Sequence, residues 1–568
     1  MKKQMLKKGA TLIIAAMTAM SAFGCSDGPS NVPGNKPVDN SKSQLYVYTY
    51  DGGIGTEWIY NAALRFEEAY AEVSFEKGKT GIQVQVGPGK SNLDSIASSP
   101  YSVFFTEQVL YNDLIAQNLL LDISDIVTAP LSNVEGCTET GTIQDKLSTE
   151  QKKAITAING NWYVLPHYEC YTGVTYDRAL FNEKNLFIKE GGGWTNLEGN
   201  LSVGSDGIRG TSDDGLPSSY EEFYNLIDRM LLYTIVPFIY TGQYSTYTNN
   251  LVTGLWASYT GADEFMLNVT YDSSKEGTLT GDDLIKTEII TGFDGDTPIT
   301  EEKTITAETG YLLSQQAGKY YALSFLQKIL GNSRYFSDTV TNVLSHLDAQ
   351  TNYVYSSLEN EPIAMIIEGS YWYNEAKESL AASVVQYGAE AEDRDFAFMP
   401  LPKQLTGQVQ EGQGSRNALY DALSSFAFIN GNIKGDEVKI KMAKAFLQFC
   451  YTDAELLNFT KTTSIFKALN YIVEESDIAH LSKYAKSVYD LRKEADVIHP
   501  YSDHKIFINN QADFSYHGTG TSWGSKVSGQ SYAFPYQAFK DGKSAKAYFQ
   551  GLAISADTWE KQFSKYFN

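Results

Sequence analysis

Short apolar segments rich in β-branched and aromatic residues recur along the chain and predict buried β-strands. Residues 362–370, PIAMIIEGS, are apolar without interruption from Ile363 to Ile367, as in strands that helices cover on both faces. A strand with one face in water would instead alternate apolar and polar residues. By the same criteria, further strands are predicted at 45–50, 80–86, 101–109, 161–166, 172–177, 395–402 and 424–430.

Segments with apolar residues at helical spacing lie between these strands. Residues 55–70 carry apolar side chains every three or four positions, which predicts an amphipathic helix. Residues 216–233 begin with two possible capping-box pairs, Ser218/Glu221 and Ser219/Glu222, and the pair Thr452/Glu455 begins another helix in the same way. Regular alternation of strands and helices predicts an α/β protein with mainly parallel sheets.

The N-terminal residues have the pattern of a bacterial lipoprotein leader. Lysines at positions 2, 3, 7 and 8 precede an apolar segment, 11–23, that is too short for a comfortable membrane span. Small residues and then Cys25 follow, which resembles the lipobox, whose cysteine is diacylated after cleavage. We therefore expect a signal peptide at 1–24 and lipidation of Cys25. The alternative is a plain secretory leader with an incidental cysteine.

The residues after Cys25 agree with a lipid anchor on the outer face of a bacterial cell membrane. Residues 25–43 consist mostly of Gly, Pro, Ser, Asn and Asp after the cysteine, so they can bury almost nothing and predict a flexible linker. Two acyl chains suffice for stable membrane attachment. The folded part of the chain is therefore expected to begin near residue 44, close to the membrane surface.

Composition narrows the classes of partner. The chain has a formal net charge of −23, which repels phosphate backbones and argues against nucleic acid as a partner. Its 39 Tyr, 28 Phe and 7 Trp make up 13% of the residues, and such side chains suit both cores and surfaces that stack on flat ligands. We expect a monomer.

Most catalytic and metal motifs are missing from the sequence. There is no HExxH and no GxSxG, and the six histidines show no ligand spacing, so a zinc protease and a nucleophile-elbow hydrolase lack their signatures. Three further cysteines, Cys137, Cys170 and Cys450, are widely spaced and form no CxxC pair. This argues against a disulfide framework and a structural zinc site but leaves one bridge open.

One glycine-rich loop has the oxygen ligands that calcium prefers. Residues 204–215, GSDGIRGTSDDG, bring together Asp206, Asp213 and Asp214. The spacing is not that of an EF-hand, although it is similar to calcium loops of secreted proteins. Two interpretations stay open, a Ca²⁺ site and an ordinary surface turn; no other cofactor is expected.

The order of these pieces along the chain resembles a known family. The lipobox and linker are followed by VFFTEQVLYNDLIAQNLLLDISD, WYVLPHYECYTGVTYDRALF, EPIAMIIEGSYWYNEA, DFAFMPLP and AFLQFCYTDAELLNFT. This order is similar to that of the extracellular solute-binding proteins, family 1, which serve carbohydrate ABC importers. The likeness covers most of the chain after residue 44, but residues 190–217 and 260–310 look like insertions and 499–530 match nothing in the family.

The resemblance implies a two-lobed α/β fold of the type II periplasmic-binding-protein kind, with discontinuous lobes and a central cleft. We expect the first lobe to contain 44–165 and about 355–425. The second lobe is expected to contain about 166–354 and 426–568. In such a fold the lobes close on a solute, here a carbohydrate, and the closed complex is handed to permease subunits in the membrane.

The resemblance also nominates ligand-binding residues. The strand end at Thr106 and Glu107 is expected to face the cleft from the first lobe, and the loop at Tyr371, Trp372 and Tyr373 is expected to supply stacking aromatics. Sugar rings present apolar C–H faces to aromatic planes and hydroxyl groups to carboxylates, which gives a physical reason for this combination. The clustering of aromatic residues in 236–259 adds three candidates, whose alternative role is core packing: Tyr240, Tyr244 and Trp256.

Two alternatives to an oligosaccharide receptor stay open. A surface glycosidase would use the same cleft and release a cleaved product, and carboxylates are too frequent in this acidic chain for any pair to be assigned as acid and base. A receptor for another solute, such as a peptide, would use the aromatic residues for apolar side chains. The sequence favours the non-enzymatic carbohydrate receptor.

Overall fold

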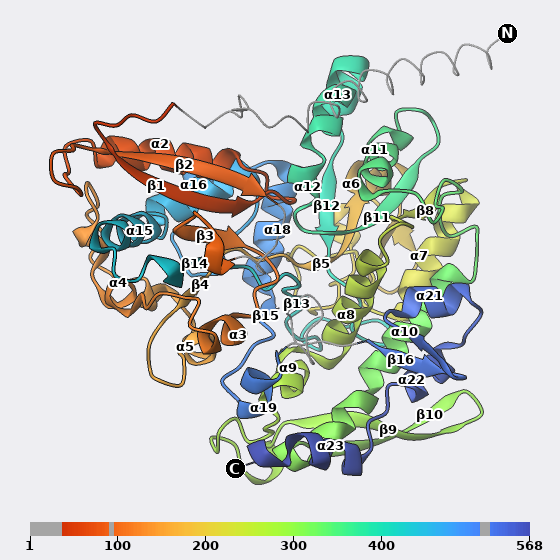
Figure 1. Cartoon of the computed structure of the whole chain (residues 1–568). Coiled ribbons are helices and arrows are strands. Elements are labelled where there is room, and N and C mark those ends of the chain that lie inside the picture. Colours follow the sequence, from red (N-terminus) through yellow and green to blue (C-terminus); the bar gives the residue numbers. More distant parts are fainter. Residues whose placement is uncertain (1–36, 90–95, 512–522, 568) are drawn as a thin grey trace.

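The computed structural model describes residues 37–89, 96–511 and 523–567, which form two lobes side by side (Figure 1). The predicted leader, Cys25 and most of the linker lie outside the described residues. Within the described part of the chain, no helix is both long and apolar enough to cross a membrane.

The first lobe is built on a five-stranded sheet in the order β2-β1-β3-β14-β4. Its strands are β1 (Ser43–Tyr50), β2 (Ile82–Gly89), β3 (Val103–Thr106), β4 (Val164–Pro166) and β14 (Phe426–Ile429). Apolar faces of helices α2 (Glu57–Ala69), α15 (Glu437–Phe449) and α16 (Asp453–Thr463) pack into one core with the sheet. Smaller elements of this lobe are α3 (Tyr111–Ala116), α4 (Ser124–Thr128) and α5 (Thr149–Ile155).

The second lobe is built on a four-stranded sheet in the order β12-β5-β11-β8. Its strands are β5 (Thr172–Asp177), β8 (Val236–Ile239), β11 (Ile363–Gly369) and β12 (Phe396–Met399). Around it lie α6 (Arg178–Lys184), α7 (Tyr220–Leu232), α8 (Thr246–Thr260), α10 (Ala317–Leu330), α11 (His346–Ser356), α13 (Lys377–Tyr387) and α18 (Lys483–Glu494). The predicted capping box at Ser219 and Glu222 begins α7, and the Thr452 side chain caps α16.

Both main sheets are mixed, whereas the sequence predicted mainly parallel sheets. In the first sheet β1 is parallel to β2 and β3, but β14 is antiparallel to both of its neighbours. In the second sheet β11 is parallel to β8, but β5 is antiparallel to β11 and β12. These antiparallel strands, β14 and β5, each follow directly on a segment that crosses from the other lobe. Their direction therefore follows from that crossing of the chain.

The same crossings correct the predicted lobe boundaries. Residues 355–425 were assigned to the first lobe, but β11 and β12 belong to the sheet of the second lobe. Residues from 426 onward were assigned to the second lobe, but β14, α15 and α16 pack in the first. The apolar pattern of a strand shows that both of its faces are buried but does not identify the neighbouring strands. For this reason the sequence-based prediction placed each of these two segments in the wrong lobe.

The predicted insertions form additions to the second lobe. Residues 190–217 contain the end of a short hairpin, β6 (Phe187–Ile188) with β7 (Trp194–Thr195), and the aspartate-rich loop. Residues 260–310 contain α9 (Ala262–Thr270) and a long hairpin, β9 (Lys286–Asp294) with β10 (Thr297–Thr304).

The C-terminal part also covers the second lobe (Figure 1). A small pair of strands, β13 (Ala418–Tyr420) and β15 (Asp496–Ile498), lies near the crossings. The last elements are α19 (Lys505–Asn509), β16 (Ser525–Val527), β17 (Gln530–Tyr532), α21 (Pro535–Lys540), α22 (Ala545–Gln550) and α23 (Ala556–Phe563).

Candidate functional site at the lobe junction

The ends of β1, β3 and β11 meet where the two lobes face each other, and we call this region the lobe junction. Tyr371 lies at its centre, as the residue before the short helix α12 (Trp372–Glu375). Its ring packs against Gly53 of the first lobe and Gly369 of the second: a Cβ added there would lie 2.7 Å and 2.5 Å from ring carbons of Tyr371. Only glycine leaves room for the ring at these two points.

A direct hydrogen bond also joins the lobes beside Tyr371. The amide Nδ2 of Asn374 donates to the carbonyl oxygen of Gly53 at 2.7 Å. The loop after β1 and the loop after β11 therefore touch, so the described conformation is one in which the lobes contact each other. A ligand between them would contact both loops.

Two further tyrosines line the second-lobe side. Tyr244 is 41% exposed and meets the ring of His346 edge to face, with centroids 5.5 Å apart. Tyr247, at the start of α8, stacks on the ring of the same histidine, with centroids 6.1 Å apart. Burial holds the pKa of the Tyr247 hydroxyl well above its ordinary value. An interaction with Tyr371, which acts in the opposite direction, connects these rings to the centre of the junction.

Buried carboxyl groups surround the tyrosines. Burial, with the nearby Glu375 and Asp421, raises the pKa of Glu107 to about 8. Burial likewise raises the pKa of Asp421 to about 7, and burial beside Glu375 holds the pKa of Glu368 well above its ordinary range. Glu107 follows β3 in the first lobe and Glu368 and Glu375 belong to the second, so both lobes contribute carboxyl groups to the junction.

These carboxyl groups have specific hydrogen-bond partners. The hydroxyl of Tyr168 donates to Glu107, and Gln350 of α11 donates to Glu368 at 3.1 Å and also to Glu375. Protonated carboxyl groups can donate as well as accept hydrogen bonds. The junction therefore combines aromatic planes with groups that can bond to hydroxyls in either direction.

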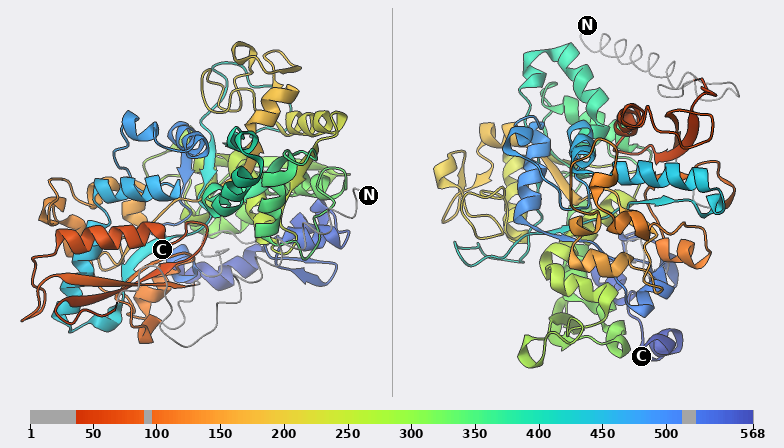
Figure 2. Two further views of the ribbon diagram at one scale, coloured as in Figure 1. Left: turned by 90° about the horizontal axis from the view of Figure 1, so that it is seen from above. Right: turned by 90° about the vertical axis from the view of Figure 1, so that its left-hand side faces the viewer.

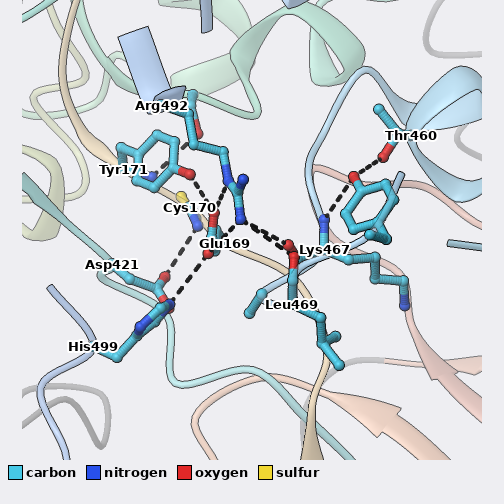
Figure 3. Close-up of polar contacts among 12 residues, drawn as sticks. Glu169, Cys170, Tyr171, Asp421, Thr460, Lys467, Leu469, Arg492 and His499 are labelled. Atoms are coloured by element: carbon cyan, nitrogen blue, oxygen red, sulfur yellow. Dashed lines mark hydrogen bonds and ion pairs between the residues drawn. The ribbon is translucent and has the colours of Figure 1, made fainter. Parts of the chain in front are cut away.

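A buried ion pair stabilises the crossing segments behind the junction (Figure 3). Glu169, between β4 and β5, accepts hydrogen bonds from Arg492 Nε at 2.6 Å and Nη2 at 3.2 Å, from His499 Nε2 at 3.2 Å and from the hydroxyl of Tyr171. Burial alone would raise the pKa of Glu169, but the charge of Arg492 and the hydrogen bonds outweigh it and lower the pKa to about 2. Glu169 is thus ionised and firmly bonded.

This network also joins the other segments that pass between the lobes. The Cys170 amide donates to Asp421 at 3.0 Å, which ties the first crossing to the second. Arg492 also donates to the carbonyl oxygens of Lys467 and Leu469, which follow α16 on the way to α18. The crossing segments are therefore held together by one set of polar contacts.

Not all predicted ligand residues lie at the lobe junction. Tyr240 and Trp256 are buried in the core of the second lobe. Trp372 is fully buried against Tyr353, and Tyr373 stacks on Tyr484 at 5.3 Å, so both pack behind the junction loop. For these four residues a core role accounts for the position.

Glu107, Tyr244 and Tyr371 do lie at the lobe junction, as does Thr106, the buried last residue of β3. Their role in binding stays a prediction. Sequence reasoning missed Tyr247 and His346, although Tyr247 opens a helix three residues after Tyr244. It also missed four other junction residues: Tyr50, Glu368, Glu375 and Asp421. Of these, Glu368 carried a usable signal, because its carboxyl group lies near the end of an apolar strand.

The aspartate-rich loop uses its carboxylates for its own structure. Asp213 is fully buried and accepts hydrogen bonds from the amides of Ser205 and Asp206 at 2.8 and 2.9 Å, and from Asn417 Nδ2 at 2.9 Å. Among the described residues, no group of three or more His, Cys, Asp or Glu side chains is placed to hold a metal ion. The arrangement gives the Ca²⁺ site with Asp206, Asp213 and Asp214 no support, and it stays a prediction.

The cysteines of the described part are unbridged. Cys137, Cys170 and Cys450 are all free, and the last two are buried. Burial raises the pKa of both buried thiols, and the nearby Asp421 and Glu107 carboxyl groups act in the same direction on Cys170. Their inert, protonated form fits a structural role.

Comparison with known proteins adds evidence on the fold. No protein-family model and no curated protein sequence matches the chain. Among solved structures, a chitin oligosaccharide binding protein is similar over 92% of this chain and 100% of its own, with a TM-score of 0.53 and 12% identity. A bacterial solute receptor, AcbH, described with an exclusive preference for β-D-galactopyranose, aligns over 93% and 99% at 14% identity, but its TM-score is 0.46. The first likeness and the two-sheet topology together show the two-lobed α/β fold of solute-binding proteins.

Proposed function

We propose that this protein is a receptor that binds a carbohydrate, most simply an oligosaccharide, between its two lobes. The observation that carries the proposal is the lobe junction itself, where Tyr371, Tyr244 and Tyr247 lie beside the carboxyl groups of Glu107 and Glu368. Pyranose rings offer apolar faces to aromatic side chains and hydroxyls to carboxyl groups. The printed ligands of both similar structures, chitin oligosaccharide and galactopyranose, agree with this class.

The proposal includes delivery of the sugar to an ABC importer by an anchored receptor. The lipobox-like sequence at Cys25 supports anchoring on the outer face of the membrane. Delivery of the sugar requires no catalytic step by the receptor itself. The predicted linker of 18 residues after Cys25 would span on the order of 24 Å as a flexible coil. That reach leaves the receptor close to a permease in the same membrane.

A second candidate, a glycosidase in the same cleft, is favoured by one observation. Glu107 has a pKa of about 8, so it is mostly protonated at neutral pH, as a general acid must be. A protonated carboxyl group serves a receptor equally well as a hydrogen-bond donor to a sugar oxygen. Recovery of the sugar after binding distinguishes the two functions.

The test is a thermal shift assay with monosaccharides, oligosaccharides and peptides, followed by chromatography of each mixture. A ligand at 100 times its dissociation constant stabilises the native state by about 2.7 kcal/mol. We expect an oligosaccharide to raise the melting temperature and to be recovered intact. A cleaved oligosaccharide would show an enzyme, a shift with peptides alone would show another solute class, and either result would overturn the proposal.

A further inference from the structure

A cavity of about 330 Å³ lies on the second lobe, between α7 and the hairpin β6–β7. Figure 2 shows the yellow segments that contain these elements at the outer edge of the lobe. None of the residues that line the cavity belongs to the lobe junction. Its size is that of a small-ligand pocket, since such pockets begin near 300 Å³.

Helix α7 presents a polar stripe to this cavity. Glu222, Asn225, Asp228 and Leu232 line the cavity and recur every three or four residues, so they lie on one face of the helix. Its apolar stripe, which includes Phe223, points into the lobe core. On the open face Glu222 closes the capping box of the helix, and Asp228 Oδ1 accepts a hydrogen bond from the Tyr335 hydroxyl at 3.3 Å.

The opposite wall supplies a fixed aromatic plane. Trp194, on β7, lines the cavity, and the guanidinium of Arg229 lies 5.0 Å from its indole centroid. Arg229 is itself held, since its Nε donates to the carbonyl of Asn185 at 2.9 Å. A side chain that is already immobilised loses little conformational entropy when a ligand stacks on it.

Glu222 has an unused acceptor at this cavity. The side chain is only 9% exposed, and its Oε2 accepts hydrogen bonds from the amide and hydroxyl of Ser218 at 2.8 and 2.7 Å. Its Oε1 is buried without a hydrogen-bond partner among the described residues. A buried acceptor without a donor is costly, so a ligand hydroxyl that reached this atom after a local side-chain shift would be stabilising.

We propose that this cavity is a second saccharide site that takes one pyranose unit. The sugar's C–H face would pack on the side of the Trp194 ring that Arg229 does not cover. Its hydroxyls would donate to Asp228 and, after a local side-chain shift, to Glu222 Oε1, with Asn225 beside them. The class of ligand rests on the proposed function, whereas the site is separate from the lobe junction. Strand β7 of the hairpin, with Trp194, lies in the segment 190–217 that looked like an insertion, so the site would be an addition to the shared fold.

Saturation-transfer NMR with methyl β-D-glucopyranoside, methyl β-D-galactopyranoside and N-acetyl-D-glucosamine tests this site. The starting variant is Tyr371→Ala, which weakens the lobe junction. In this background we expect a monosaccharide to give a saturation-transfer signal. Adding either Trp194→Ala or Glu222→Gln should weaken the affinity for that monosaccharide at least tenfold. Tyr46→Ala, an exposed tyrosine of β1, is the control that should change nothing.

Two variants keep the test independent of folding. Trp194→Ala removes a hairpin residue, but Glu222→Gln preserves the cap of α7, because glutamine also closes a capping box. Absence of any monosaccharide signal in the Tyr371→Ala protein, or equal affinities in all variants, would overturn the second site. Failure of the proposed function would look different: oligosaccharide affinity would not respond to Tyr371→Ala, whatever the cavity binds.

Discussion

Removing the negative charge of Glu169 tests the role of the polar network behind the lobe junction. The change Glu169→Gln keeps the shape of the side chain but leaves the guanidinium of Arg492 without its buried partner. Glu169 is only 2% exposed and carries two bonds from Arg492, so its charge is weakly screened by water. We expect a large loss of stability.

The magnitude follows from the pKa of the carboxyl group. Lowering it from the ordinary 4.5 to about 2 corresponds to roughly 3 kcal/mol of stabilisation of the folded state. This agrees with the roughly 3–5 kcal/mol lost when one partner of a buried ion pair is removed. Because the pKa is depressed, the contribution is present above about pH 4.5 and is lost as the pH falls toward 2.

Differential scanning calorimetry measures the effect against a matched exposed pair. We expect Glu169→Gln to lower the melting temperature by about 3–6 °C, at about 1–2 °C per kcal/mol for a chain of this size. Arg416 Nε lies 2.7 Å from Asp496, nearly the same distance as in the buried pair, but the two side chains are 50% and 51% exposed. Asp496→Asn should therefore cost less than about 1 kcal/mol.

A double variant separates the unpaired charge from a general loss of packing. Replacing both partners, as Glu169→Gln with Arg492→Met, should restore much of the stability, because no uncompensated charge stays buried. If Glu169→Gln costs no more than Asp496→Asn, the ion pair does not stabilise the crossing segments. If the double variant is less stable than Glu169→Gln, the reasoning about the unpaired charge is wrong.

The remaining predictions concern titration and calcium. Since the folded pKa of Glu107, about 8, exceeds its ordinary 4.5, its stabilisation is complete below about pH 4.5 and is lost as the pH rises through 8. The melting temperature should therefore fall less between pH 5 and 9 in Glu107→Gln than in the wild type; equal slopes would contradict this. If the loop at Asp206 binds calcium, 1 mM Ca²⁺ raises the wild-type melting temperature and not that of Asp206→Asn, whereas no calcium effect in the wild type refutes the site.

The local elements could be predicted well because each depends on neighbouring residues. Apolar, β-rich runs marked every strand of the two main sheets except β8, and the limits predicted for 172–177 are those of β5. The lobe membership and direction of β11, β12 and β14 could not be predicted in the same way. They depend on which distant strand is the neighbour, and the apolar pattern is the same for either choice.

The site was predictable where a residue type conflicted with its surroundings. Glu107 stood out as a carboxyl group at the end of an apolar strand, and Tyr371 came from the family resemblance. Aromatic clustering alone was a poor guide, because Tyr240 and Trp256 fill the core of the second lobe. Asp421 comes to the junction through a crossing segment, so its proximity to Glu107 is a result of tertiary structure alone.

The central claim, that a carbohydrate binds between the two lobes, is tested most directly by isothermal titration of the best oligosaccharide into the wild type and Tyr371→Ala. Loss of a stacking aromatic side chain removes on the order of 2 kcal/mol of binding energy. We therefore predict at least about tenfold weaker binding in Tyr371→Ala, with an unchanged affinity in the Tyr46→Ala control. Equal affinities for the wild type and Tyr371→Ala would contradict the claim that the sugar binds at the lobe junction.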